Sequence, residues 1–396
     1  MRCDAITKPR RNCHLPNTKQ ATLHAGLVSK GRTTAQPPPA SARNTMDVIV
    51  PGPSIRPFCA AIGCLSRIGK ELYIDFDPID GLSVRSLNDS KSVFGSFHFE
   101  PAFFDRCRSA RASVDPARSR KRRIGGESTE RSSSSSNKND DDERWTVRIA
   151  MKALAPVVRQ RRDVLDLRVS TSGDHLAFGF RLQKTSGSVV SVSHRVGYAP
   201  AKGVAAVADT EGASELVVQP AVLATMLEPL KRSAEIALLV SETHRLVSGV
   251  SFAHDDLPEG SSPSPSAPGR GRDPSNAPLK TETSVGYDDL VEVHYAGRPG
   301  AGRGILDSTG IEPPGDLHER VVLVFTLKEF KAFLQYCSQA VPDRELRTSI
   351  QFFWGGRPIV ANTKGDQFSA ELVTATLDHR LLGTMKTSAT STEAGR

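Results

Sequence analysis

The residues best suited to binding chemistry in this sequence are Lys and Arg side chains placed at helical spacing. Between residues 55 and 70, Arg56, Arg67 and Lys70 share one stripe with small residues, and no acid interrupts it. Apolar residues of the same period form the opposite stripe, which predicts a helix with its apolar side in a core. A basic stripe on one helix is usually only a solvated face, so it indicates phosphate binding only if other helices share it.

Three further segments show related patterns. Their basic residues are Arg148, Lys152 and Arg159 in a helix predicted over 145–161, Lys231 and Arg232 in one over 220–232, and Lys328 and Lys331 in one over 326–340. Pro156 and Pro229 predict that the second helix is short or kinked and that the third ends early. If the four helices lie on one side of a sheet, these cations would line a DNA site and bind phosphates without reading bases.

The fourth helix has the best defined start. Thr326 and Glu329 have the spacing of a capping box, in which side chains bond to the first free backbone N–H groups of a helix. Phe325 and Phe330 have the spacing of a hydrophobic staple. Both patterns predict a helix that begins beside Thr326.

An enzyme hypothesis starts from Asp75, Asp77 and Asp80, which would suit the Mg²⁺ site of a nuclease. These residues lie where a predicted strand runs into a Pro-containing turn, and Asp is common in turns for reasons of backbone geometry. No Ser/His/Asp arrangement, HExxH motif, Walker loop or paired zinc spacing accompanies them. We therefore expect no catalytic residue, metal or cofactor, and a metal-dependent exonuclease is the less favoured alternative.

Composition indicates two folded domains with loose segments. The chain has 396 residues, of which 38% are hydrophobic, so it is long enough to bury two cores of ordinary size. Its formal charge of +8 is misleading, because residues 1–45 hold eight basic side chains against Asp4 and so carry +7 by themselves. The remainder is nearly neutral, and only the arrangement of its charges can indicate a partner.

Cysteine usage and hydropathy indicate a soluble intracellular protein. The six cysteines are scattered, and none has a CxxC spacing. A reducing compartment fits this pattern best, and the helical position of Cys59 favours a buried thiol over half of a metal site with Cys64. No apolar run approaches the roughly 18 residues that a membrane-spanning helix needs.

Low-complexity segments divide the chain. We expect a disordered basic extension over 1–45, which is transit-like or lies upstream of the true start at Met46. The predicted units that follow are a first domain over 46–200 with a disordered insert at 108–144, a connector over 201–214, a second domain over 215–386 with loose inserts at 255–284 and 297–315, and a short tail over 387–396. The order of helices and strands is similar in the two domains, which suggests a repeat.

The first insert contains a basic run that is a candidate signal for nuclear import. Its residues are Arg120, Lys121, Arg122 and Arg123. Serines at 128–136 and the Ser-Pro segment at 262–267 are candidate phosphorylation sites, with unmodified loops as the alternative. We expect the protein in the nucleus.

Several segments resemble a known family. The clearest similarity runs over 65–73, 80–88 and 97–104, and a second covers 325–330, 356–358 and 372–377. A weaker one covers 151–158 and 220–227. These segments resemble the Rad-nine subunit of the nine-one-one DNA-damage checkpoint clamp, which is related in fold to the proliferating cell nuclear antigen.

The resemblance implies a fold and partners. It implies an α+β protein with two tandem sliding-clamp domains, each a sheet with two helices on its inner face. Three such subunits would close into a ring around double-stranded DNA, with partners similar to Rad-one and Hus-one, a checkpoint clamp loader, and repair enzymes docked on the outer face. A homotrimeric replication-type clamp is the alternative, although the long inserts and sparse basic residues of the middle helices favour a heterotrimer. Members commonly carry a long phosphorylated C-terminal tail, and the sequence ends at Arg396 soon after its last predicted strand.

Overall fold

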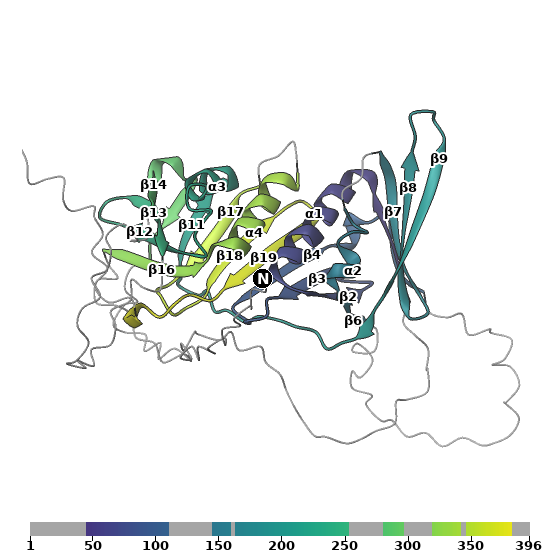
Figure 1. Cartoon of the computed structure of the whole chain (residues 1–396), viewed down its shortest axis with the longest axis horizontal. Coiled ribbons are helices and arrows are strands. Elements are labelled where there is room, and N and C mark those ends of the chain that lie inside the picture. Colours follow the sequence, from purple (N-terminus) through teal and green to yellow (C-terminus); the bar gives the residue numbers. More distant parts are fainter. Residues whose placement is uncertain are drawn as a thin grey trace, which may run out of the picture.

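The computed structural model describes residues 45–110, 145–159, 163–252, 280–296, 319–341 and 346–381. Its architecture is mixed α+β, with antiparallel sheets and four α-helices in these ranges (Figure 1). No helix there is long and apolar enough to cross a membrane.

A ten-stranded sheet runs through both halves of the chain. Its strands, in spatial order, are β10 (Ala199–Pro200), β6 (Trp145–Ala150), β2 (Glu71–Asp77), β3 (Gly81–Leu87), β4 (Val93–Phe99), β19 (Phe368–Thr374), β18 (Ile359–Lys364), β17 (Thr348–Phe352), β11 (Ser214–Val218) and β15 (Glu292–His294). The halves join where β4 pairs with β19, with Phe97 opposite Ala370. Backbone hydrogen bonds therefore continue from one half into the other.

Two smaller sheets lie at the ends of the molecule (Figure 1). One has the order β5 (Arg106–Ala110), β1 (Thr45–Pro51), β7 (Val164–Ser172), β8 (His175–Gln183) and β9 (Val189–Gly197). The other has the order β14 (Glu282–Gly286), β13 (Leu246–Phe252), β12 (Glu235–Ser241) and β16 (Arg320–Thr326). Strand β9 ends the first sheet and β14 ends the second, at opposite ends of the molecule.

The helices cover one face of the ten-stranded sheet. They are α1 (Gly52–Ile68), α2 (Met151–Leu154), α3 (Pro220–Leu227) and α4 (Leu327–Gln339). Helix α1 packs on α4, and α4 packs on α3, so helices from both halves lie side by side (Figure 1). Phe97 of β4 meets Tyr336 of α4 edge-on at 4.6 Å between ring centroids, which ties the helix layer to the sheet across the junction of the halves.

The helices follow from the apolar periods of their sequences. In α4 the side chains of Phe330, Phe333 and Leu334 are almost fully buried, as the 3.6-residue period predicts. Burial of a side chain of this size stabilises a fold by about 1.5–3 kcal/mol. Phe325 and Phe330 form the predicted staple, with ring centroids 5.1 Å apart. The capping box is wrong, because Thr326 makes no side-chain capping bond and its hydroxyl is buried without a hydrogen-bond partner.

The second predicted helix is mostly wrong. Residues 145–150 form strand β6, and only Met151–Leu154 are helical. Val147 and Ile149 are buried and alternate with exposed Arg148, which is the two-residue period of a strand. The predicted end of the third helix is confirmed, since α3 stops at Leu227 before Pro229.

Two predicted inserts begin or end at other residues than expected. The insert at 108–144 overlaps β5, which continues to Ala110 because it pairs with β1. The insert at 255–284 overlaps β14, which begins at Glu282 and pairs with β13. Strand β1 was also missed, so folded structure starts at Thr45. The insert at 297–315, the tail over 387–396 and the basic extension lie outside the described residues, apart from Thr45.

The connecting segment 201–213 contains no helix or strand and crosses the face of the large sheet that the helices leave uncovered. Arg85 reaches it by donating from Nη1 to the carbonyl oxygen of Val204 at 3.2 Å. The same guanidinium pairs with Asp75 at 2.6 Å, and the side chain of Asp75 is only 6% exposed. A buried ion pair therefore anchors the connecting segment to the first half of the chain.

Gly81 is required by the turn between β2 and β3. Its φ is +104°, and a Cβ there would lie 2.2 Å from the carbonyl oxygen of Phe99. Gly81→Ala is expected to lower the free energy of unfolding by more than about 2 kcal/mol, measured by urea denaturation. Gly173→Ala is the control, because Gly173 also has a positive φ of +66° but no atom within 4 Å of its Cβ position. Equal losses in the two variants would show that the contact with Phe99 carries no cost.

Candidate nucleic-acid interface

The exposed side of the helix layer contains a groove between α1, α3 and α4. Its volume is about 560 Å³. The side chains that line it are mostly basic, polar or small, and they are Arg67, Ala224, Glu228, Lys231, Ser233, Leu327, Lys328, Lys331, Ala332, Leu334, Gln335, Ser338 and Gln339. The groove thus brings together four of the predicted DNA-lining residues from both halves of the chain.

Glu228 lies between two of these lysines. Its carboxylate accepts from Lys231 Nζ at 2.9 Å and from Lys331 Nζ at 2.8 Å. These hydrogen bonds, from Lys331 first and then Lys231, lower the pKa of Glu228 to about 2. Glu228 is therefore ionised at neutral pH and offsets part of the positive charge of the groove.

Arg67 is held at the opposite side of the groove. Its guanidinium donates to the side-chain oxygen of Gln335, which joins α1 to α4. Lys328 is exposed one turn earlier on α4. Since Gln335 is an uncharged acceptor, Arg67 keeps its charge uncompensated by this contact and faces solvent beside Lys328.

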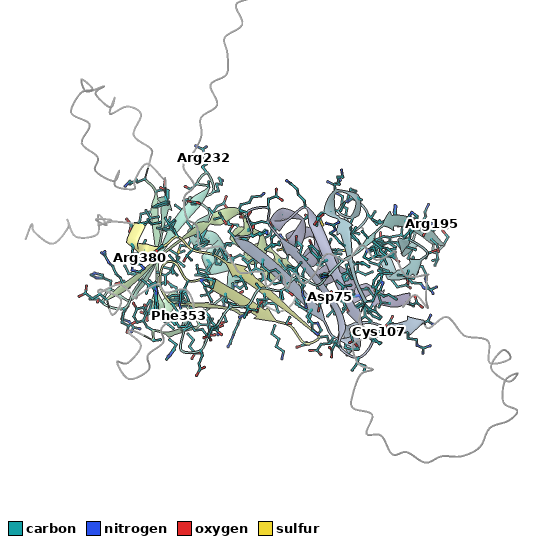
Figure 2. The ribbon with its side chains drawn as sticks, turned by 90° about the horizontal axis from the view of Figure 1, so that it is seen from below. Asp75, Cys107, Arg195, Arg232, Phe353 and Arg380 are labelled. Atoms are coloured by element: carbon teal, nitrogen blue, oxygen red, sulfur yellow. The ribbon has the colours of Figure 1, made fainter. Side chains whose placement is uncertain are left out.

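The other predicted lining residues are more scattered. Arg56 is half-buried on α1, and Lys152 is exposed on α2. Arg159 and Arg232 are exposed in the segments that follow α2 and α3, and Figure 2 shows Arg232 at the rim of the molecule. Lys70 lies beyond the end of α1 and pairs with Asp89.

Arg148 does not lie on a helix, contrary to the sequence prediction. It extends from β6, on the face of the sheet that the helices leave uncovered, and pairs with Glu71 at 3.0 Å. The alternation along β6 buries Val147 and Ile149 under the helix layer and so turns Arg148 away from it. The structure therefore separates Arg148 from the groove.

The three aspartates considered as a metal site do not converge. Asp75 pairs with Arg85, whereas Asp77 accepts hydrogen bonds from the backbone N–H groups of Ile79 at 2.8 Å and Asp80 at 3.3 Å. The latter contacts are turn geometry. Within the described residues, no group of three or more His, Cys, Asp and Glu side chains is placed to hold a metal ion.

The helical cysteines are part of the core. Cys59 and Cys64 of α1 and Cys337 of α4 are buried. Burial raises the pKa of Cys59 and of Cys337 to about 12 and raises that of Cys64 further. These thiols are protonated at neutral pH, which agrees with the predicted packing role of Cys59.

Sequence reasoning missed a polar hollow of about 860 Å³ on the uncovered face of the large sheet. Glu371 of β19 lies in it, and burial raises the pKa of this carboxyl group, although the charge of Arg85 opposes the shift. Ser96 of β4 and Asn362 of β18 flank Glu371 in register. Alternation of polar and apolar residues along β19 is the sequence signal that could have indicated this second polar face.

Comparison with known proteins supports the assignment of the fold. The chain is similar to proliferating cell nuclear antigen from Thermococcus kodakaraensis, with a TM-score of 0.53, 11% identity, and coverage of 84% of this chain and 99% of that one. A PCNA2–PCNA3 complex from Sulfolobus tokodaii gives 0.51, 9%, 83% and 98%. A. fulgidus PCNA bound to the C-terminal region of FEN-1 gives 0.50, 10%, 84% and 98%. At these identities the similarity shows the clamp fold alone.

The family model for Rad9 matches residues 58–377. This match includes α1, α3, α4 and the junction between β4 and β19. It covers most of the chain and agrees with the clamp fold found by structural comparison. The chain therefore belongs to the Rad9 family of sliding-clamp proteins.

Proposed function

We propose that this protein is one subunit of a heterotrimeric checkpoint clamp that encircles double-stranded DNA and gathers signalling and repair factors at DNA damage. The observation that carries the proposal is the groove on the helix layer of a Rad9-family clamp, where Arg67, Lys231, Lys328 and Lys331 come together. The protein acts by binding and not by catalysis.

The groove suits contact with a phosphate backbone. Its cations extend from helices whose other faces are buried, so the protein holds them in place before DNA arrives. Lys and Arg contacts to phosphates do not depend on sequence and weaken as salt rises. Such contacts would let a ring bind any duplex and move along it.

Free strand edges support ring closure. Among the described strands β9 pairs only with β8, and β14 pairs only with β13. Each edge has unpaired backbone groups, and the two edges lie at opposite ends of the molecule (Figure 1). Pairing of one subunit's β9 with β14 of the next is a head-to-tail contact, and such contacts generate rings when the rotation closes.

The uneven distribution of charge favours different neighbours over identical ones. Helix α3 contains no Lys or Arg, and Lys152 is the one cation in α2. A heterotrimer can supply the missing lining from subunits similar to Rad-one and Hus-one. The PCNA2–PCNA3 complex shows that clamps of this fold are found with unlike partners. The FEN-1 complex is the model for repair enzymes that dock on the outer face, and a checkpoint clamp loader would open the ring.

The test is co-expression of the full chain with Rad-one and Hus-one homologues from the same source. Size-exclusion chromatography with light scattering should give a one-to-one-to-one complex. A stable homotrimer would favour a replication-type clamp instead, and a monomer in the presence of both partners would contradict ring assembly.

Removal of the Glu228 carboxylate is expected to strengthen DNA binding. Glu228→Gln frees Lys231 and Lys331, so affinity of the assembled complex for duplex DNA should rise about tenfold and the salt dependence should steepen by about two phosphate contacts. Because the pKa of Glu228 is about 2, the gain should be the same from pH 5 to pH 8. Fluorescence anisotropy at several salt concentrations measures both effects.

Glu292→Gln is the control for Glu228→Gln. It removes the same charge from an exposed site on β15, away from the groove. If both variants bind DNA equally well, net charge explains the gain and Glu228 has no special position.

We further propose that the protein acts in the nucleus. The basic run Arg120–Arg123 lies outside the described residues, as do the serines at 128–136 and the segment 262–267. Replacing the four basic residues by alanine is expected to shift a fluorescent fusion of the full chain from the nucleus to the cytoplasm. An unchanged distribution would show that this run is not the import signal.

A further inference from the structure

The five-stranded sheet has a strongly basic outward face. Its other face is apolar and buried, with Val48, Leu167 and Phe178 almost inaccessible, and α1 packs against β1 and β7. The outward strand positions include five arginines and two aspartates, which are Arg106, Arg108, Arg168, Arg181, Arg195, Asp47 and Asp166. No lysine occupies an outward strand position on this sheet.

Strand register places these arginines in adjacent rows. Ile49 pairs with Arg106 on one side and with Arg168 on the other. In the next row Arg108 pairs with Asp47, and Arg195 pairs with Ala177. Strands lie about 4.8 Å apart, so the row from β5 to β9 is about 19 Å wide, which an extended peptide of about six residues would span.

Two aspartates fix three of the arginines in position. Asp47 binds Arg168 at 2.7 Å and Arg106 at 3.3 Å, and Asp166 binds Arg181 at 3.1 Å. Partial burial raises the pKa of Asp47, but the hydrogen bonds and charges of Arg168 and Arg106 outweigh it and lower the pKa overall. The arginine side chains remain 43–57% exposed and so present ordered guanidinium groups to solvent.

The remaining arginines are exposed and border a shallow strip of small residues. Within the described part of the chain, neither Arg108 nor Arg195 forms an ion pair, and Figure 2 shows Arg195 at the end of the molecule opposite Arg380. Small side chains occupy the strip beside them, at Ser170, Ala177, Gly179, Ser191 and Ser193. A ligand can therefore approach the backbone of β7, β8 and β9 between the guanidinium groups.

We propose that this outward face binds an extended acidic peptide, rich in Asp or Glu, from a partner protein. Guanidinium groups bind carboxylates through two parallel hydrogen bonds, and the exclusive use of arginine fits such planar contacts better than it fits general attraction of anions. The ordered arginines lower the entropy cost of binding. The site is distinct from the helix groove, because α1 packs on the opposite face of this sheet.

A peptide fits the face better than nucleic acid does. Single-stranded nucleic acid is held mainly by stacking on aromatic rings, and Phe178 and Phe180 of this sheet point into the core. A duplex presents a negative charge about every 1.7 Å, so phosphates would meet Asp47 and Asp166. A peptide can place uncharged residues opposite the aspartates and its carboxylates opposite the arginines.

The test uses the full chain and a fluorescent 12-residue peptide of alternating Glu and Ala. Two variants remove the site in different ways. Arg108→Glu/Arg195→Glu reverses two arginines that have no ion-pair role in the fold. Gly179→Glu places a carboxylate in the strip of small residues, where a Cβ would be 3.9 Å from its nearest neighbour, the carbonyl oxygen of Arg168, and so fits without strain. Lys328→Glu in the helix groove is the control.

Each site variant is expected to weaken binding of the Glu–Ala peptide by at least about tenfold, since each charge-assisted hydrogen bond contributes that much. Lys328→Glu should leave peptide binding unchanged. Circular dichroism and urea midpoints equal to those of the wild type would show that the site variants are folded. The proposal is overturned if the wild type binds the peptide no better than the variants do, or if the variants lose duplex or single-stranded DNA binding while peptide binding persists.

Discussion

Replacing Arg67, Lys328 and Lys331 together by glutamate is expected to weaken duplex binding by the assembled complex at least about a hundredfold at low salt. Each side chain lines the groove, and each charge-assisted contact to a phosphate contributes about tenfold. Loss of three phosphate contacts should also reduce the slope of log affinity against log salt by about three. Anisotropy titrations between 50 and 200 mM salt would measure both quantities.

The control reverses three lysines elsewhere on the surface. Lys184, Lys202 and Lys364 are exposed and none of them lines the groove, so the triple change to glutamate alters net charge by the same amount. Affinity should fall by severalfold at most. If the groove variant assembles normally but binds DNA as the control does, the helix layer does not face DNA. If it fails to assemble, the same residues belong to a subunit contact.

Arg85→Ala is expected to destabilise the protein by about 3–5 kcal/mol, the cost of leaving one partner of a buried ion pair without the other. Asp75 is the residue left uncompensated, and its Oδ1 already lacks a hydrogen-bond partner. Loss of the bond to Val204 should also release the connecting segment. Urea unfolding measures the first effect, and the rate of proteolysis within 201–213 measures the second.

A double variant separates charge from packing. Asp75→Asn/Arg85→Met removes both charges and keeps similar volumes, so its stability should be within about 1–2 kcal/mol of the wild type. Its connecting segment should still be cleaved faster, because the bond from Arg85 to Val204 is absent. Equal stability of Arg85→Ala and the wild type would show that the pair is not buried in solution.

Local patterns in the sequence predicted α1 and α4 well because their apolar residues have a strong helical period. The bounds were less accurate at α1, which starts at Gly52 and ends at Ile68. The segment with Arg148 was misassigned for a physical reason. Over six residues, Val147 and Ile149 fit either a strand or the first turn of a helix, and pairing of β6 with β2 decides between them.

Long-range contacts are what the sequence could not supply. Glu228 meets Lys331 across 103 positions, and Arg67 meets Gln335 across 268. Both contacts exist only because β4 joins β19 and brings α1 beside α4. The charge of Glu228 was visible in the sequence, but its position between two lysines was not.

The basic sheet face has the same origin. Its arginines come from β5, β7, β8 and β9, and no single strand has a pattern that stands out. Strand order and register gather them on one side of the sheet, away from α1. Single segments therefore predicted elements, whereas the binding surfaces arise from the arrangement of those elements.

The most direct test of the proposed clamp is retention of the assembled complex on circular DNA. The complex would be loaded on a nicked plasmid by its loader, washed at high salt, and then exposed to a restriction enzyme that linearises the DNA. A ring that encircles DNA should stay on the circle and slide off the linear ends within minutes. Equal release before and after cutting would contradict encirclement and leave a protein that binds DNA only through its surface charge.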